Sequence, residues 1–369
     1  MTYSLLFQVV NMEERYLRHI QLENIGKEGQ EKISRAKVLV VGAGGLGCPA
    51  LQYLCAAGVG TLGIMDHDTV ERSNLQRQIL FTESDIGHNK AEVAQRHLRK
   101  INSQISIHAH SLALTSKNAM EIIGDYDLVI DGTDRLSTRY LISDTCLLLN
   151  KVMVYGALFK FEGQVSVFNY RKGPSYRCLF PKPPEEGEIP NCSETGILGV
   201  LPGTIGVLQA TETLKVILNL GEILSGKLLC MNLLTHQQTQ FHFKRKEQEI
   251  KKVIQNKIPL SSSIENCFTD FQVSLNQIEK DEEIMWVDIR EENELPKIRF
   301  KHLTPIPMSQ SHLLHTIKGG NKKIVLFCQT GLRSQIAVQK LRASGSQNCF
   351  SLEEGAEVLN QWQQNQWKQ

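Results

Sequence analysis

The chain has 369 residues, of which 41% are hydrophobic and 22% charged, and its formal net charge is +2. This length exceeds what one hydrophobic core usually serves, so we expect two domains of ordinary globular composition. The balanced charge argues against a strongly basic surface for nucleic acid and against a strongly acidic one, so partners must be inferred from local motifs.

The N-terminal segment and the apolar stretches carry no export or membrane signal. Residues 1–10 lack a basic region and a small-residue cleavage site, and Met12 is an alternative start. The uncharged stretch 197–210 is interrupted by glycine and proline, which favours a loop followed by a buried helix over a membrane span. Nine irregularly spaced cysteines indicate reduced intracellular thiols. We therefore predict a cytoplasmic protein that binds neither membrane nor nucleic acid.

From residue 37 onward the chain alternates strand and helix patterns. A short apolar run leads directly into the glycine segment Gly42-Ala-Gly-Gly-Leu-Gly47 and then into a helical pattern over 49–57. Further strand-like runs, separated by helix-like segments, lie at 61–65, 128–130, 152–155 and 165–168. Strands separated by helices predict an α/β fold with a Rossmann-like, doubly wound, mostly parallel sheet.

A second pattern begins after a charged, polar stretch. Residues 243–257 are rich in charge, and serines follow Pro259 closely, so this part of the chain is the best linker candidate. Beyond it we expect a strand ending at 286–290, a strand at 324–327, and a helix at 334–343. The predicted division is a first domain at 1–245, a linker at 246–263, and a small α/β domain at 264–369.

The glycine segment fits the pattern G-x-G-x-x-G. Its backbone amides and the following helix N-terminus favour a phosphate, and Asp66, about 20 residues further on, is placed to bind a ribose hydroxyl. By itself this motif indicates only a nucleotide, so a nicotinamide or flavin enzyme remains open.

Two cations and a carboxylate change that interpretation. Arg77 and Lys90 fall near the expected phosphates, where a dehydrogenase has no need of them. Either residue alone would be taken for a solvated surface charge, but together they suit transfer of an acyl carboxylate onto the α-phosphate, which must offset charge on departing pyrophosphate. Asp134 follows the strand at 128–130, at the edge where ligands bind, and is a natural magnesium ligand.

These motifs together resemble the ubiquitin-activating-type adenylyltransferases of the HesA/MoeB/ThiF family, over about residues 12–245. The residues that carry the resemblance are Arg15-Tyr-Leu-Arg18, the glycine segment, Asp66-His-Asp68, Ser73-Asn-Leu-Gln-Arg-Gln78, Lys90 and Gly-Thr-Asp134. The resemblance implies a homodimer that uses ATP and magnesium, with Arg18 reaching into the partner's site. The nucleotide-contacting set that it predicts is Gly42, Gly44, Gly45, Gly47, Asp66, Ser73, Asn74, Leu75, Gln76, Arg77, Lys90, Asp134 and Arg135.

Cys328 begins the segment Cys-Gln-Thr-Gly-Leu-Arg-Ser334, in which loop amides and a helix N-terminus can stabilise a thiolate or persulfide. Arg333 can add positive charge. The segment resembles the C-x-x-G-x-R-S loop of the rhodaneses, and two further rhodanese landmarks are matched at 288–290 and 351–355. The resemblance implies that Cys328 carries a persulfide, loaded by a donor such as a cysteine desulfurase.

Cys192 lies in a polar segment that contains glycine and has no periodicity, as expected for a mobile loop over the active site. Such a thiol can reach an acyl adenylate, and in the family the matching cysteine is linked to a covalent thioester or acyl-persulfide step. A merely structural cysteine remains the alternative.

The family pattern breaks at its structural zinc. Relatives use two C-x-x-C pairs, but this chain has Ser175-Tyr-Arg-Cys178 and no second pair after Phe241. Because a structural zinc site wants four ligands, we predict that zinc is absent.

The two resemblances together therefore imply adenylation of the C-terminal Gly-Gly carboxylate of a ubiquitin-like sulfur carrier, followed by persulfide transfer to form a thiocarboxylate. A carrier of the molybdopterin-synthase small-subunit type is the first choice and the thiamine carrier the second. The alternatives are a carrier-binding module without adenylation activity and a nicotinamide-dependent oxidoreductase.

Overall fold

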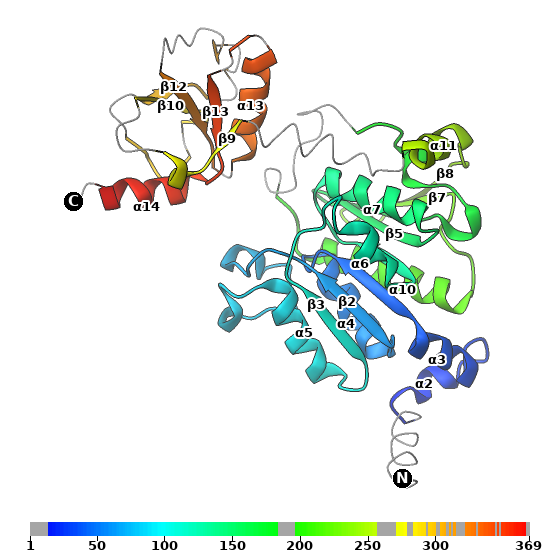
Figure 1. Cartoon of the computed structure of the whole chain (residues 1–369). Coiled ribbons are helices and arrows are strands. Elements are labelled where there is room, and N and C mark those ends of the chain that lie inside the picture. The colour runs from blue at the N-terminus through cyan, green and yellow to red at the C-terminus, as the bar shows by residue number, and fades with distance from the viewer. Residues whose placement is uncertain are drawn as a thin grey trace. The chain divides into compact units, whose positions relative to one another are not determined.

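The computed structural model describes residues 14–183, 196–256 and 271–366, the last range without 279–282, 293, 300–302, 308–309, 311–312, 315–321, 330, 344 and 347. The chain folds as two compact units (Figure 1). The described residues up to 256 belong to the first unit, and those from 271 onward belong to the second.

The first unit is built on one eight-stranded sheet with the order β3-β2-β1-β4-β5-β6-β7-β8. The five strands from β3 to β5 are parallel, and β6, β7 and β8 continue the sheet in antiparallel pairs. The strands are β1 (Lys37–Val41), β2 (Thr61–Met65), β3 (Ser106–His110), β4 (Leu128–Asp131), β5 (Val152–Phe159), β6 (Glu162–Phe168), β7 (Lys227–Asn232) and β8 (Gln238–His242).

Helices cover both faces of this sheet (Figure 1). Alternate residues of β1 point into two separate apolar cores: Val38 and Val40 pack with α4, α5 and α10, while Leu39 and Val41 pack with α6 and α7. The helices of the unit are α2 (Leu17–Ile20), α3 (Gly26–Arg35), α4 (Gly47–Ala57), α5 (Lys90–Ile101), α6 (Ala119–Gly124), α7 (Leu136–Leu148), α8 (Tyr176–Leu179), α10 (Val200–Leu218) and α11 (Glu247–Asn256), with 3₁₀ turns at Arg72–Asn74, Glu83–Asp85 and Tyr170–Lys172.

The predicted fold class is confirmed. The strands at 37–41 and 61–65 have the predicted bounds, and a helix follows the glycine segment. The stretch 197–210 leads into α10, which begins at Val200, as the loop-and-helix interpretation required. Strand β3 is not predicted from hydrophobic patterning, because its Ser-Ile-His-Ala-His run is mostly polar, as suits an edge strand. Within the described residues, none of the helices has the length and apolar character that a membrane span requires.

Part of the predicted linker is a packed helix. Residues 247–256 form α11, in which Ile250 and Val253 are 1% and 3% exposed. Residues 257–263 of the same prediction lie outside the described residues, as does Met12. The boundaries 1–245, 246–263 and 264–369 stay predictions.

The second unit is a five-stranded parallel sheet with the order β11-β10-β12-β13-β9. The strand predicted to end at 286–290 ends at Asp288, and the helix predicted at 334–343 begins at Leu332. Its elements are β9 (Gln272–Val273), β10 (Ile284–Asp288), β11 (Leu303–Pro305), β12 (Lys323–Phe327), α13 (Leu332–Ala343), β13 (Cys349–Leu352) and α14 (Ala356–Gln366), with a 3₁₀ turn at Leu275–Gln277.

Truncating a buried α11 side chain should destabilise the first unit alone. We expect Ile250→Ala to lower its free energy of unfolding by about 2 to 5 kcal/mol, whereas Ile254→Ala, at an exposed position, should change it by less than about 0.5 kcal/mol. All three tryptophans lie after residue 280, so fluorescence follows the second unit while circular dichroism follows both. A shift of the fluorescence transition in Ile250→Ala would contradict this assignment of α11.

Candidate functional site

The site is organised around the loop that joins β1 to α4. Gly42 has a positive φ of 94°, and a Cβ there would lie 2.6 Å from the carbonyl oxygen of Gly132 in the loop after β4. A Cβ on Gly47 would overlap the carbonyl oxygen of Gly42. Glycine is therefore required for the tight turn and for the close approach of the two loops. The 11-residue helix α4 begins without a side-chain cap, so its N-terminus offers amides and a positive dipole end to an anion.

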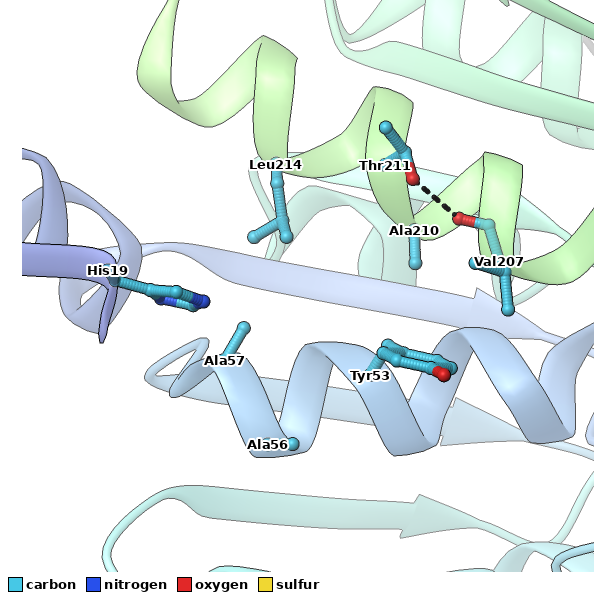
Figure 2. Close-up of a pocket in the computed structure, with 8 residues that line it drawn as sticks. All are labelled: His19, Tyr53, Ala56, Ala57, Val207, Ala210, Thr211 and Leu214. Carbon is cyan, nitrogen blue, oxygen red and sulfur yellow. Dashed lines mark hydrogen bonds between the residues drawn. The ribbon is translucent and has the colours of Figure 1, made fainter. Parts of the chain in front are cut away.

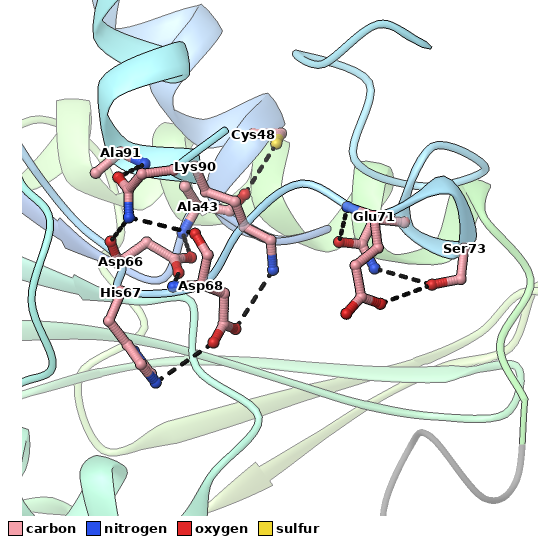
Figure 3. Close-up of polar contacts among 11 residues, drawn as sticks. Ala43, Cys48, Asp66, His67, Asp68, Glu71, Ser73, Lys90 and Ala91 are labelled. Atoms are coloured by element: carbon pink, nitrogen blue, oxygen red, sulfur yellow. Dashed lines mark hydrogen bonds and ion pairs between the residues drawn. The ribbon is translucent and has the colours of Figure 1, made fainter. Parts of the chain in front are cut away.

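Asp66 follows the last residue of β2 and is tied to the glycine loop (Figure 3). Its Oδ2 accepts a hydrogen bond from the Ala43 amide at 2.8 Å, and its Oδ1 accepts one from the Asp68 amide at 2.9 Å. The residue is only 9% exposed, and burial raises the pKa of its carboxyl group. Asp66 thus lies beside the predicted phosphate loop, as a ribose-binding carboxylate must.

Lys90 is the first residue of α5, and its ammonium group approaches Asp68 (Figure 3). The side chain is 9% exposed, and Nζ lies 3.4 Å from Asp68 Oδ2, while Nε2 of His67 lies 3.3 Å from Asp68 Oδ1. Ligand atoms of Asp66, His67 and Asp68 lie within 4.8 Å of one another. We do not assign a metal to them, because both carboxylates already have partners.

The segment after β2 brings Arg77 to the glycine loop. Its Cγ lies 3.5 Å from where a Cβ on Gly45 would be, and its Nη1 donates to the Ser73 carbonyl oxygen at 3.0 Å. Asn74 is buried and accepts a hydrogen bond from the Glu71 amide at 3.2 Å, so its side chain shapes the turn. The Ser73 hydroxyl donates to Glu71 at 3.1 Å (Figure 3).

Two further residues of the predicted nucleotide-contacting set lie against neighbouring parts of the protein. Leu75 packs on the apolar core, and the Gln76 side-chain oxygen lies 2.7 Å from where a Cβ on Gly199 would be. Leu75 therefore supports the loop through packing, whereas Gln76 is an exposed residue whose side chain lies beside Gly199.

The two aspartates after β4 have different surroundings. Asp131 is fully buried: its Oδ2 accepts from Arg139 Nε at 2.7 Å, and its Oδ1 accepts from the Thr133 amide at 3.0 Å and hydroxyl at 2.8 Å. Arg139 also donates to the Thr133 carbonyl oxygen at 2.9 Å and lies over the Tyr155 ring, 4.9 Å from its centroid. Asp131 is therefore a structural clamp on its own loop.

Asp134, by contrast, is exposed, and its carboxylate pairs with no residue of the described chain. An unpaired carboxylate at the carboxyl edge of a parallel sheet, beside a phosphate loop, fits the oxygen ligands that Mg²⁺ prefers. Arg135, next along the chain, is also exposed. The motif pointed to this loop, but its spacing could not show that Asp131 is buried or that Arg139 holds it.

Arg18 is exposed on the short helix α2, and its Nη1 donates to Gln21 at 3.3 Å. Its neighbour His19 lines a groove of about 200 Å³ between α2, α4 and α10 (Figure 2). The groove is mostly apolar, and the Tyr53 ring stands at its wall with 58% of the residue exposed. The residues that line it are His19, Tyr53, Ala56, Ala57, Val207, Ala210, Thr211 and Leu214.

Cys328 lies at the carboxyl end of β12 in the second unit and is buried. The Ser334 hydroxyl lies 3.7 Å from its sulfur, and Gly331 in the loop between them has a positive φ of 87°. Arg333 does not present an uncompensated charge, because it forms a bidentate pair with Glu294 at 2.7 and 2.6 Å that lowers the pKa of that carboxyl group. Cys192 lies outside the described residues.

Cys178, at the position of the first C-x-x-C pair of the family pattern, is a hydrogen-bonded thiol. Cys178 is buried, its sulfur accepts from the Lys246 amide at 3.2 Å, and it lies 3.5 Å from the Ser175 hydroxyl. One thiol beside a hydroxyl and a backbone amide does not fit a four-ligand zinc site.

Comparison with known proteins agrees with the motifs. Residues 16–252 match the ThiF family and residues 272–364 match the rhodanese-like domain. A "Sulfur carrier protein adenylyltransferase" of Thermus thermophilus is 51% identical over 60% of this chain and 83% of its own length. An "Adenylyltransferase and sulfurtransferase MOCS3" of Drosophila sechellia is 39% identical over 89% of this chain and 78% of its own length.

Some matches are shorter, and the solved structures bear on the fold alone. The MOCS3 protein of Culex quinquefasciatus is 52% identical over 58% of this chain, but the match spans about half of that protein, 49% of its length. The crystal structure of E. coli MccB with ATP is similar with a TM-score of 0.54 and 24% identity, over 63% of this chain and 72% of that one.

The raised pKa of Asp66 predicts a pH dependence. The folded chain holds the Asp66 proton more tightly than the unfolded chain, so this contribution to stability is present at low pH and lost as the pH rises through the raised pKa. The free energy of unfolding of the wild type, relative to Asp66→Asn, should therefore fall as the pH rises from about 4, the ordinary pKa of aspartate, through the raised pKa of Asp66. Urea unfolding followed by circular dichroism at a series of pH values measures it.

Lys90→Met provides the matched variant for this test. The Lys90 charge lowers the pKa of Asp66, so Lys90→Met should extend the fall in the free energy of unfolding to higher pH. If the free energy of unfolding of the wild type, relative to Asp66→Asn, stays constant or increases with pH, the raised pKa of Asp66 is contradicted.

Proposed function

The chain belongs to the ThiF family and carries a rhodanese-like domain, and from this premise we propose that it adenylates the C-terminal carboxylate of a ubiquitin-like sulfur carrier and then delivers sulfur to it. One observation carries the proposal: the uncapped N-terminus of α4, the buried residues Asp66 and Lys90, and Asp134, which has no partner among the described residues, all lie at the carboxyl edge of one parallel sheet. The names of the similar proteins from Thermus and Drosophila agree with it.

In the adenylation step the residues of this edge hold ATP. The glycine loop and the α4 N-terminus receive the phosphates, Asp66 binds the ribose, and Arg77 and Lys90 offset charge on the departing pyrophosphate. Asp134 would hold Mg²⁺, which supplies further charge neutralisation at the phosphates. The carrier carboxylate attacks the α-phosphorus, giving an acyl adenylate and pyrophosphate.

The sulfur step uses the second domain. A persulfide on Cys328, loaded by a donor such as a cysteine desulfurase, attacks the acyl carbon and expels AMP, which leaves an acyl disulfide. A second thiol then attacks the Cys328 sulfur and releases the carrier as a thiocarboxylate; Cys192 is our candidate for it. The resulting disulfide is reduced by an external thiol. Having both domains on one chain raises the effective concentration of donor and acceptor.

The carrier that we prefer is of the molybdopterin-synthase small-subunit type, with the thiamine carrier second. Both end in Gly-Gly, and glycines let a chain approach another backbone closely. We also propose that the protein works in the cytoplasm. It has no structural zinc in this proposal, because Cys178 has backbone and hydroxyl partners instead of further thiolates.

We further propose that the active protein is a homodimer joined through the groove between α2, α4 and α10. Tyr53 and two leucines of the α2 region, Leu17 and Leu22, are large apolar side chains that are 46% to 58% exposed in the single chain. Arg18 lies on the same helix as the groove residue His19. A second copy seated here would therefore carry its α2, and with it Arg18, across the interface, consistent with action in trans.

Carrier-dependent ATP-pyrophosphate exchange tests the adenylation step. With carriers that end in Gly-Gly, we expect exchange that falls by about a hundredfold or more in Asp134→Ala, because loss of the ion leaves the pyrophosphate charge uncompensated. Glu121→Ala, at an exposed carboxylate of α6, should leave it unchanged. Cys328→Ser should keep exchange but abolish thiocarboxylate formation, which Cys349→Ser should retain. Exchange without any added carrier, or none with every carrier, would refute the proposal.

Disrupting the groove should separate the protomers. Val207→Glu places a charge in the apolar groove and should give a monomer by light scattering that has lost exchange, whereas Ile254→Glu, on exposed α11, should remain a dimer. Co-expressed Arg18→Ala and Asp134→Ala chains should regain exchange, because the mixed dimer contains one complete site. Their failure to complement, with mixed dimers present, would place Arg18 in its own protomer's site.

A further inference from the structure

Helix α10 runs along the loops of the nucleotide site. A Cβ on Gly199 would overlap the carbonyl oxygen of Gln76, a Cβ on Gly45 would lie 2.9 Å from Pro202 Cβ, and a Cβ on Gly206 would overlap the carbonyl oxygen of Leu46. The N-cap residue Gly199 and the helix residues Pro202 and Gly206, each about one turn from the next, thus lie against the glycine loop and the segment after β2. Small residues at these points let the helix approach that backbone closely.

The next turn of α10 carries a polar side chain into the core. Gln209 is 0% exposed, and its Nε2 donates to the carbonyl oxygens of Asp131 at 2.7 Å and Val154 at 3.3 Å. A Cβ on Gly156 would lie 2.6 Å from the Gln209 amide carbon, so the glycine leaves room for the amide. Burying an amide costs free energy unless it makes hydrogen bonds, and here the amide nitrogen donates to two neighbouring strands, to β4 at its last residue, Asp131, and to β5 at Val154 within the strand.

Asp131 is therefore held from two sides. Arg139 binds its carboxylate, and Gln209 binds its backbone carbonyl group. Three residues further along, the Asp134 carboxylate has no partner in the described part of the chain, so its place depends on the loop that precedes it. The Asp131 carbonyl group lies at the start of that loop, directly before Gly132, which contacts Gly42.

We propose that Gln209 is a positioning residue of the nucleotide site: by fixing the Asp131 carbonyl it holds Asp134 where a magnesium ion on the nucleotide can reach it. This inference rests on the proposed ATP and magnesium site. Gln209 touches neither the nucleotide nor the ion and acts through the loop 131–134. Its neighbours Val207, Ala210 and Thr211 line the groove, so an occupant of the groove contacts the helix turn that delivers Gln209.

The test separates metal-dependent from metal-independent binding. Calorimetry measures the affinity of the full chain for a non-hydrolysable ATP analogue, without carrier, in Mg²⁺ and in EDTA. We expect Gln209→Met, which keeps the volume but removes the donor, to weaken binding about tenfold in Mg²⁺ and to leave it unchanged in EDTA. The matched control is Thr213→Val, a buried residue of α10 whose hydroxyl donates to the Gln209 backbone carbonyl at 2.8 Å; it should match the wild type in both conditions.

A second variant acts on the amide from the opposite side. Gly156→Ala places a methyl group against the Gln209 amide carbon and should produce the same Mg²⁺-specific loss, which decides the case if Gln209→Met does not fold. Equal losses in Mg²⁺ and EDTA, the same loss in Thr213→Val, or a wild type whose affinity does not depend on Mg²⁺ would each overturn the proposal. Because no carrier is present, failure to adenylate any carrier would leave this result intact and would count against the proposed function alone.

Discussion

The close approach of two backbone loops, one after β1 and one after β4, is the constraint on which the site depends. Gly42 and Gly132 face each other at a separation that admits no Cβ on either, and the amides of both continue the hydrogen bonding of the sheet, from Gly42 to Met65 and from Gly132 to Val41. This contact sets the phosphate loop beside the loop that carries Asp134. A larger residue at either position would separate the nucleotide-binding and cation-binding halves of the site.

The acidic residues around that contact differ in their burial and in the partners of their carboxylates. Asp131 is fully buried, and its carboxylate accepts hydrogen bonds from Arg139 and Thr133. The carboxylate of Asp66 accepts hydrogen bonds from two backbone amides. Asp134, exposed and unpaired in the described chain, is the carboxylate left for a ligand. The buried carboxylates with hydrogen-bond partners hold the loops in place, and the exposed carboxylate of Asp134 is the one that can bind a ligand. In the second domain Glu294 pairs with Arg333, so the surroundings of Cys328 are less positive than its loop sequence suggests.

Local patterns were enough to predict the strands 37–41 and 61–65, the glycine turn and the fold class, because hydrophobic periodicity and turn residues act over short distances. Motif spacing placed Asp66, Arg77 and Lys90 around one loop. It could not show that Asp131 is a clamp, that Arg333 has a carboxylate partner, or that Gln209 on α10 reaches the end of β4, because each depends on a residue distant in sequence or on burial. The sequence of α11 predicts a linker because its charged residues outnumber the apolar ones, although Ile250 and Val253 form a buried face.

Taken together, the ThiF-family domain and the rhodanese-like domain place carboxylate activation and sulfur delivery on one chain. The most direct test of this account follows an oxygen atom. A Gly-Gly carrier labelled with oxygen-18 in its terminal carboxylate is incubated with ATP, the enzyme and a sulfur donor, and the AMP formed is examined by mass spectrometry. If the carboxylate attacks the α-phosphorus and the acyl carbon is then attacked by sulfur, AMP carries one labelled oxygen. Unlabelled AMP, or label in pyrophosphate or phosphate, would contradict it.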